Sequence, residues 1–393
     1  MNTKRAPKVR FKGFTDAWEQ RKFESIATRA SSISADPTLP QVEYEDIISG
    51  IGLLNKDVKL KESSKQGIVF NQGDVLYGKL RPYLHNWLLP TFSGLAVGDF
   101  WVLQPKDADS SFLFRLIQGQ QFDDVANQST GTKMPRADWN LVSKTLFFIP
   151  TSIDEQALIG RYFRSIDNLI ALHQRKLDKM KELKKAFLNL IFSQKLRFEG
   201  FTDSWELRKL GEVAPLRGGY AFQSNQYANE GIPIVRISNI LSDGSVGGEF
   251  VFHNELKDDE IFMLENGDIV LAMSGATTGK VSILSSEKFC KYYQNQRVGL
   301  FSKTATCNYS FVATIVRSEK FLEQLRDVLV AGAQPNVSAK DIDAFDFSVP
   351  KDVEEQSQIG NFFRTLDRLI TLHQKKIDSL KEMKKILLKN MLI

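Results

Sequence analysis

Two long segments of the chain are near copies of each other, and this repeat constrains the fold more than any other feature. IPTSIDEQALIGRYFRSIDNLIALHQRKLDKMKELKK begins at Ile149, and VPKDVEEQSQIGNFFRTLDRLITLHQKKIDSLKEMKK begins at Val349. A shorter pair precedes them: RFKGFTDAWEQRKF begins at Arg10 and RFEGFTDSWELRKL at Arg197. Tandem copies in the same order indicate two structural units built on one plan.

The stretches between the repeated motifs, about 19–148 and 206–348, barely resemble each other. The offset between copies grows from 187 at the short motifs to 200 at the long ones, so the second stretch is longer by 13 residues. The halves, about 10–196 and 197–393, therefore share a frame and differ in their contents.

Each long copy predicts a helix of about 40 residues, or roughly 60 Å at 1.5 Å per residue. Pro150 lies just upstream, and Ser152 with Glu155 fits a capping box; the second copy has Pro350, Asp352 and Glu355 at the same places. Apolar residues then alternate at spacings of four and three, which is a heptad seam. The seam comprises Ile159, Phe163, Ile166, Ile170, Leu177, Met180, Phe187 and Ile191, and in the second copy Ile359, Phe363, Leu366, Ile370, Ile377, Leu380, Leu387 and Met391.

An apolar stripe of this length has to be buried, and the other copy is the obvious partner. Heptads do not distinguish parallel from antiparallel pairing, but a tandem repeat with pseudo-two-fold symmetry favours the antiparallel arrangement. His173 and His373 interrupt the seam, as do Lys184 and Lys384. No acidic or cysteine cluster lies near the histidines, so we interpret them as polar spacers within the seam rather than as ligands or bases.

The first variable stretch contains GDVLYGKLRPYLHNW from Gly73, which predicts a strand followed by a basic and aromatic turn. Lys79, Arg81 and Tyr83 lie on that turn. STGTKMPRADWNLVSKTLFFIP follows near the end of the stretch, with Lys133 and Arg136 on a turn before a final strand.

The second variable stretch repeats this outline with other residues. IPIVRISNI predicts a strand from Ile232, GDIVLAMSGATTGKVSIL a strand, a glycine-rich turn and a strand, and AGAQPNVSAKDIDAFDFSVP the closing turn and strand. We therefore expect a mixed α/β domain with a predominantly β core in each half. The polar and basic groups concentrate on turns, where recognition commonly resides.

The turn GATTGK resembles a phosphate-binding loop, but its spacing does not fit. Three residues instead of four separate Gly275 and Gly279, and Val281 follows Lys280 where a magnesium-binding hydroxyl is needed. The four histidines and two cysteines form no metal-ligand spacing, so we predict no metal site. The Asn-Pro-Pro-aromatic motif of amino-methyltransferases and a nuclease constellation are also missing. The pattern indicates a binding protein rather than an enzyme.

Composition is that of a globular protein and limits the possible partners only weakly. The chain is 42% hydrophobic and 25% charged, which is enough for ordinary globular cores, and its net charge of +5 permits nucleic-acid binding without establishing it. No run of about 18 apolar residues is present, so we expect a cytoplasmic protein without a membrane contact.

Taken together, these motifs resemble the specificity subunit of type I restriction–modification systems over nearly the whole chain. They are the twin GFTD-[AS]-W openings, GDVLYGKLRPY, GDIVLAMSGATTGK followed by NQRVGLF, AQPNVSAKDI, and the twin EQ…IG.[YF]FR…LI.LHQ[RK]K segments. The resemblance implies an α+β protein in which two target-recognition domains are joined by two long helices that form an antiparallel coiled coil. The expected boundaries are 1–150 for the first domain, 151–196 for its helix, 197–350 for the second domain and 351–393 for its helix.

The resemblance also implies a function. Each domain would read one half of a bipartite gapped site in double-stranded DNA, and the helices would set the spacing. The subunit has no catalytic centre of its own. It would dock two adenine-N6 methyltransferase subunits as well as restriction (motor and nuclease) subunits, with S-adenosylmethionine, ATP and magnesium on those partners and no cofactor in this chain.

Candidate DNA contacts follow from the matching turns. They are Lys79, Arg81, Tyr83, Lys133 and Arg136 in the first domain, and Ser274, Thr277, Thr278, Lys280, Gln334 and Asn336 in the second. The candidate helix-pair seam is Ile166, Ile170, His173, Leu177 and Met180 against Leu366, Ile370, His373, Ile377 and Leu380. The alternative function is a coiled-coil scaffold that binds only protein.

Overall fold

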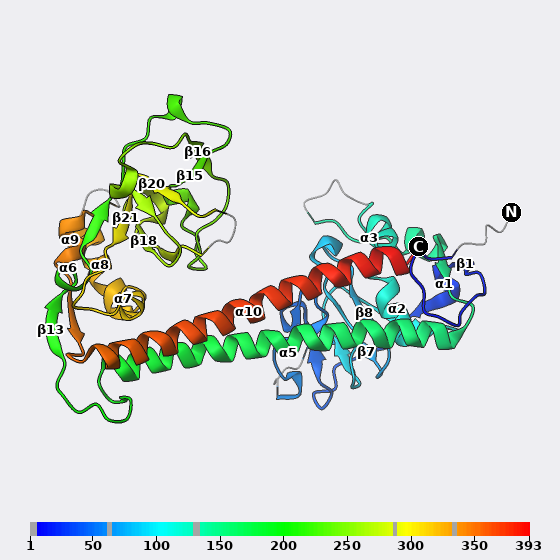
Figure 1. Cartoon of the computed structure of the whole chain (residues 1–393). Coiled ribbons are helices and arrows are strands. Elements are labelled where there is room, and N and C mark those ends of the chain that lie inside the picture. The colour runs from blue at the N-terminus through cyan, green and yellow to red at the C-terminus, as the bar shows by residue number, and fades with distance from the viewer. Residues whose placement is uncertain (1–5, 61–64, 129–133, 286–288, 332–335) are drawn as a thin grey trace. The chain divides into compact units, whose positions relative to one another are not determined.

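The computed structural model describes residues 6–60, 65–128, 134–285, 289–331 and 336–393, and the chain divides into two compact units (Figure 1). Unit 1 comprises Met1–Lys176 with His373–Ile393, and unit 2 comprises Leu177–Leu372. Each unit therefore combines one variable stretch with the first part of its own long helix and the last part of the other.

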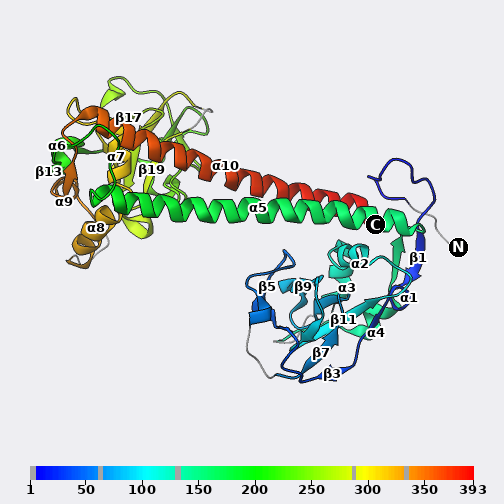
Figure 2. The ribbon, with the colours of Figure 1, turned by 90° about the horizontal axis from the view of Figure 1, so that it is seen from below.

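The variable part of unit 1 is built mainly of short strands, with helices near its end (Figure 2). Its elements are β1 (Glu19–Lys22), α1 (Phe23–Ile26), β2 (Ala27–Arg29), β3 (Ile33–Ser34), β4 (Gln41–Val42), β5 (Ile47–Ile48), β6 (Leu53–Leu54), β7 (Gly67–Phe70), β8 (Val75–Gly78), β9 (Trp87–Leu88), β10 (Gly94–Ala96), β11 (Phe100–Pro105), α2 (Ser110–Leu116), α3 (Gln120–Ala126), α4 (Trp139–Lys144) and β12 (Leu146–Ile149).

Unit 2 follows the same plan. Its elements are β13 (Glu206–Lys209), α6 (Leu210–Val213), β14 (Leu216–Gly218), β15 (Ile232–Val235), β16 (Val251–His253), β17 (Met263–Leu264), β18 (Ile269–Ala272), β19 (Val281–Ile283), β20 (Tyr292–Gln294), β21 (Val298–Phe301), α7 (Tyr309–Ile315), α8 (Glu319–Ala331), α9 (Ala339–Asp343) and β22 (Asp346–Val349). The long helices are α5 (Ile153–Phe192) and α10 (Val353–Met391).

The two units share the topology of one sheet. The strand order is β2-β11-β8-β9 in unit 1 and β14-β21-β18-β19 in unit 2, with antiparallel pairing throughout. The Gly-Asp motifs predicted to start strands lie directly before β8 and β18, which are the central strands of these sheets. The turns that follow the two motifs are therefore structural counterparts.

Side chains alternate between the two faces of the shared sheet, as the two-residue period of a strand requires. In unit 1, Leu76, Phe100 and Val102 point into a core shared with the second sheet, β3-β7-β10-β4. Tyr77 and Trp101 face the other way and contact aromatic residues of α3 and α4. The sheet is thus covered on both faces, and its exposed turns are presented by a packed scaffold.

The short GFTD-[AS]-W motif attaches each variable stretch to its helix. In unit 1, the Arg10 guanidinium donates to both carboxylate oxygens of Glu155 at 2.6 and 2.7 Å, and the Trp18 indole donates to the same carboxylate. Arg197, Trp205 and Glu355 repeat these contacts in unit 2. The predicted role of Glu155 and Glu355 as reciprocal capping side chains is therefore wrong in both copies. The Glu155 backbone N–H does reach Ser152, but its carboxylate pairs with Arg10 and Trp18 instead of capping the helix.

The two long helices pair antiparallel within each unit. As residue numbers increase along α5, the residues of α10 that they contact decrease in number. In unit 1, Asp167 lies 2.7 Å from Lys384, and His173 and His373 lie 2.8 Å apart between their Nδ1 atoms. In unit 2, Lys184 lies 2.6 Å from Asp367. Figures 1 and 2 both show the end of α10 beside the start of α5. The seam residues are buried (Ile166, Ile170, Leu177, Ile377, Leu380) or half-buried (His173, Met180, Leu366, Ile370, His373).

The lysines that interrupt the seam belong to two equivalent charge clusters. In unit 1, Asp167 accepts from Arg115 at the end of α2 and from Lys384, each at 2.7 Å. In unit 2, Asp367 accepts from Arg317 at 2.8 Å and from Lys184 at 2.6 Å. Each lysine therefore satisfies a carboxylate on the partner helix, and a charge in the seam is tolerated because it is paired.

Candidate nucleic-acid interface

The basic turn of unit 1 is held against the segment that precedes α4. The Arg81 N–H donates to the Pro135 carbonyl at 2.7 Å, and the Ala137 N–H donates to the Lys79 carbonyl at 2.8 Å. The structure thus brings Lys79 and Arg81 close to Arg136, which follows them in the sequence by more than 50 residues. Lys133 lies outside the described residues.

Two cations of this surface share one carboxylate. Asp99 lies 3.6 Å from the Lys79 Nζ and 3.1 Å from an Arg136 Nη. These pairs are partly exposed, so they orient the cations more than they stabilise the fold. Tyr44 supports the turn from beneath, because its hydroxyl donates to the Asp99 carbonyl and accepts from the Leu80 N–H. Burial raises the pKa of Tyr44 above its usual range, so the hydroxyl keeps its proton.

The turn then projects two side chains outward. Arg81 and His85 adopt left-handed backbone conformations, with φ of 49° and 55°, on either side of a single 3-10 turn over Pro82–Leu84. Tyr83 and Leu84 are exposed on that turn. His85 is held at 2.9 Å from Asp123 and stacks on Trp87. Left-handed conformations are costly for residues other than glycine and cluster at functional sites, which favours this turn as a contact surface.

The counterpart turn of unit 2 is more polar and less basic. Gly275–Thr277 forms a single 3-10 turn, and Lys280 donates to the Ser242 hydroxyl at 2.8 Å. The Thr277 hydroxyl donates to the Ile237 carbonyl and that of Thr278 to the Gly275 carbonyl, so both position the turn itself. Ser274 lies half-buried at its start.

The closing segment of unit 2 meets this turn as its counterpart does in unit 1. The Val337 N–H donates to the Met273 carbonyl at 3.0 Å, which brings the exposed Asn336 close to the turn that starts at Ser274. Gln334 lies outside the described residues. The predicted contact residues that are described therefore gather on one surface in each unit.

The structure agrees with the exclusion of a phosphate-binding loop. After Lys280 the chain continues as strand β19, where a phosphate-binding loop needs a helix whose N-terminus faces the phosphate. Within the described residues, no group of three or more His, Cys, Asp or Glu side chains could hold a metal ion. In the same part of the chain, none of the helices combines the length and the hydropathy needed to cross a bilayer.

Sequence reasoning missed residues that complete the unit 1 surface. Asp99 orients two of the predicted cations, and Arg29 and Trp139 lie beside Lys79 around one pocket. The stretch PRADW contains Trp139, but the helix that carries it, α4, was not predicted. No local pattern relates Arg29 to residue 139, because the pairing of β2 with β11 and the packing of α4 against β11 bring them together.

Comparison with known families matches the second half of the chain. Residues 202–382 match the family model of the type I restriction modification DNA specificity domain. This segment covers the variable part of unit 2 and most of α10, the long helix that pairs with α5.

Curated proteins with similar sequences carry the same description. The specificity subunit of the type I restriction enzyme MjaVIII from Methanocaldococcus jannaschii is 24% identical over 298 residues, which cover 71% of this chain and 68% of that protein. The EcoAI specificity subunit of Escherichia coli is 26% identical over 210 residues, which cover 51% of this chain and 35% of that protein.

Solved structures share the fold over the whole chain. The S subunit of a type I restriction-modification system from M. genitalium has a TM-score of 0.70 at 14% identity, covering 99% of both chains. A chain from a study of complex assembly and conformational transition of the type I R-M system has a TM-score of 0.51 at 16% identity, covering 94% of this chain and 96% of that one.

The second half of the chain thus matches a DNA specificity domain, and the first half repeats its frame. In sequence the chain is similar to type I restriction enzyme specificity subunits, and it shares the fold of an S subunit over its whole length.

Proposed function

We propose that this chain reads a bipartite, gapped DNA site, one half with each unit, for a type I restriction–modification complex. The observation that carries the proposal is the contrast between frame and contents. The helix pairs, the Arg–Glu–Trp contacts and the shared sheet recur in both units. The turns presented by the two sheets differ in every predicted contact residue, so the two half-sites should differ in base sequence.

The chemistry of the turns supports contact with duplex DNA. Lys79, Arg81 and Arg136 offer cations for backbone phosphates, and such contacts position a protein on the duplex. Arginine, asparagine and glutamine side chains can form paired hydrogen bonds with base edges. On these grounds, Arg81 is the best candidate for base reading in unit 1 and Asn336 in unit 2.

We further propose that two methyltransferase subunits dock on equivalent apolar patches of the long helices. The unit 1 patch combines exposed Leu169 and Leu172 of α5 with Met383 and Ile386 of α10. The unit 2 patch comprises Leu369, Leu372, Leu183 and Leu190, also exposed. The pairs 169/369, 172/372 and 183/383 occupy the same positions of the repeat, whereas Leu190 and Ile386 do not correspond. Two patches that share these three positions fit two copies of one partner.

The remaining partners and the cofactors follow from the same assignment. We propose that restriction subunits join the complex through the assembled methyltransferase, and that S-adenosylmethionine, ATP and magnesium belong to those partner subunits. This chain would then contribute DNA recognition and spacing alone, with helix length setting the gap between the half-sites.

Methylome sequencing of cells with and without the gene tests DNA reading. We expect one gapped, asymmetric adenine-methylation motif to disappear on deletion and to return with the wild-type gene. Arg81→Ala should relax or change bases only in one half of the motif, and Asn336→Ala only in the other. A methylome that is unchanged by deletion contradicts the proposal.

The stoichiometry of the complex tests the docking patches. Analytical ultracentrifugation with the methyltransferase subunit should give two copies per wild-type chain, one copy for Leu172→Asp, and none for the double variant with Leu372→Asp. Lys185→Asp changes an exposed residue on another row of α5 and serves as the control. Two bound copies on the double variant would place the docking surface elsewhere.

A further inference from the structure

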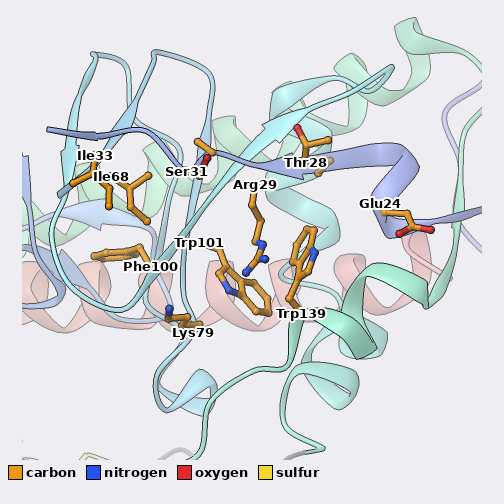
Figure 3. Close-up of a pocket in the computed structure, with 12 residues that line it drawn as sticks. Glu24, Thr28, Arg29, Ser31, Ile33, Ile68, Lys79, Phe100, Trp101 and Trp139 are labelled. Carbon is orange, nitrogen blue, oxygen red and sulfur yellow. The ribbon is translucent and has the colours of Figure 1, made fainter.

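A pocket of about 580 Å³ opens beside strands β2 and β11 of unit 1 (Figure 3). Arg29 projects from the end of β2 into the space between Trp101 on β11 and Trp139 at the start of α4. Lys79, the first cation of the predicted contact turn, lines the same pocket. The pocket is therefore continuous with the candidate DNA surface of this unit.

The Arg29 side chain is oriented but not neutralised. Its guanidinium carbon lies 4.6 Å from the centre of the Trp139 ring, a cation–π contact. Trp101, which is 3% exposed, packs edge-on against Trp139 with ring centres 5.3 Å apart and so supports it. Within the described part of the chain, the guanidinium has no ion pair or hydrogen bond. An arginine held in this way keeps its five N–H donors available.

The lining favours an anion as the ligand. Arg29 and Lys79 supply two positive charges, and Asp99 beside Lys79 is shared with Arg136, so the cations exceed the carboxylate. Thr28 and Ser31 add hydroxyl groups to the lining. Among the described lining residues, Glu24 is the only acidic one, and it lies at the far end of the pocket from Lys79 (Figure 3). A phosphate oxygen accepts strong, charge-assisted hydrogen bonds from arginine and lysine.

Unit 2 carries other residues at the positions that form this pocket, although its sheet is equivalent. Tyr77 and Leu271 occupy the same position after the Gly-Asp motif of their unit. Trp101 pairs with Tyr77 and Gly299 pairs with Leu271, so Gly299 is the counterpart of Trp101. By the same register, Arg29 on the edge strand corresponds to Leu216. Trp139 corresponds to Ala339, since each is the first residue of the helix before the last strand. The cation and both indoles are thus replaced together, as expected for parts of one site.

We infer that this pocket binds a phosphodiester group of the DNA backbone, with Arg29 and Lys79 as its donors and Trp139 as the platform that orients Arg29. The inference rests on the proposed DNA-reading function and adds an anchor whose arginine and two tryptophans are replaced in unit 2 by Leu216, Gly299 and Ala339. A stacked base is disfavoured, because Arg29 already occupies the face of Trp139. A phosphate contact carries no base information, so the anchor should strengthen binding to all sequences equally.

The test is the salt dependence of DNA binding by the full chain. Affinity is measured from low to high KCl on duplexes with and without the methylated motif, for the wild type, Arg29→Gln, Arg29→Lys and Lys79→Gln. Each phosphate contact contributes about −0.9 to the slope of log K against log salt. Arg29→Gln should lower the magnitude of the slope by about 0.9 on both duplexes. Arg29→Lys should retain most of the slope, because it keeps the charge.

Arg161→Gln is the matched control, since Arg161 is an exposed arginine of unit 1 that lies on α5, outside the pocket. It should leave the slope at the wild-type value. Circular dichroism of each variant verifies folding, and Arg29 is exposed, so its replacement should be tolerated. The methylated motif of cells that carry Arg29→Gln should keep every base of the wild-type motif.

Two results would overturn the inference while leaving the proposed function intact. One is a wild-type slope for Arg29→Gln, and the other is a changed base in the first half of the methylated motif, which would make the pocket a base reader. A wild-type chain that shows no motif preference and no salt dependence would remove the proposed function and this inference together.

Discussion

The buried charge cluster of unit 1 provides the most quantitative prediction. Asp167 is 6% exposed and accepts from Arg115 and Lys384, which are 2% and 9% exposed. Burial lowers the pKa of both cations, and the charge of Asp167 acts in the opposite direction on both. Asp167→Asn keeps the size of the side chain but removes the charge. Removing one member of a buried ion pair costs about 3–5 kcal/mol, because the remaining charge is left without a partner.

The repeat offers a matched control in unit 2. Asp367 makes the same two contacts, but its side chain is 31% exposed, so water can solvate Arg317 and Lys184 when the charge is lost. Asp367→Asn should therefore cost only about 1 kcal/mol, as for exposed ion pairs. For a unit of about 200 residues, each kcal/mol shifts Tm by roughly 2–4 °C.

Differential scanning calorimetry of the full chain separates these outcomes. Asp167→Asn should lower Tm for unit 1 by roughly 6–20 °C, and Asp367→Asn should lower Tm for unit 2 by roughly 2–4 °C. Replacing the whole cluster with Arg115→Met, Asp167→Leu and Lys384→Met should recover most of the loss, because no buried charge then remains. Equal shifts for the two single variants would refute the assignment of the cost to burial.

Three further predictions concern the frame. The pKa of His173 is lowered from 6.5 by burial and by the positive groups His373, Lys176 and Lys376, so the folded state binds fewer protons than the unfolded state just below pH 6.5. Stability should therefore fall as pH drops from 7.5 to 5.5, and His173→Gln should reduce that fall in Tm; an undiminished fall would assign it to other groups. A Cβ on Gly160 would overlap Ser111, so Gly160→Ala should destabilise unit 1 by about 1–3 kcal/mol in urea unfolding, whereas Gly218→Ala, where a Cβ meets nothing within 4 Å, should have a far smaller effect. Inserting four residues, about one turn, into α5 should change the gap of the methylated motif or abolish methylation; a changed half-site sequence would contradict the separation of spacing from reading.

Local patterns predicted much of the frame. The period of alternating fours and threes predicted the long helices, because the apolar residues that form a helix face recur within two turns. The Gly-Asp motifs predicted the starts of β8 and β18, and the run VSIL predicted β19. The strand expected over IPIVRISNI is shorter, because the chain leaves β15 after Val235 and forms a 3-10 turn over Ile237–Asn239.

Contacts between distant residues lay beyond such patterns. Glu155 was interpreted as a capping residue, but its carboxylate accepts hydrogen bonds from Arg10, which lies 145 residues away in the sequence. Lys384 was interpreted only as an interruption of the seam, but it is held by Asp167 of the other helix. Spacing along a helix predicts which face a residue occupies. It does not predict which side chain from another element will meet that residue.

The sequence by itself determined the duplication, the two paired helices and the polar turns after the Gly-Asp motifs, because each depends on neighbours within a few residues or on comparison of the two copies. The tertiary structure decided which of those turns belong to one surface and which charges are paired. It also placed Arg29 on Trp139 beside Lys79, through the pairing of β2 with β11 and the position of α4. Such a site arises when three segments pack together, and no single segment carries its pattern.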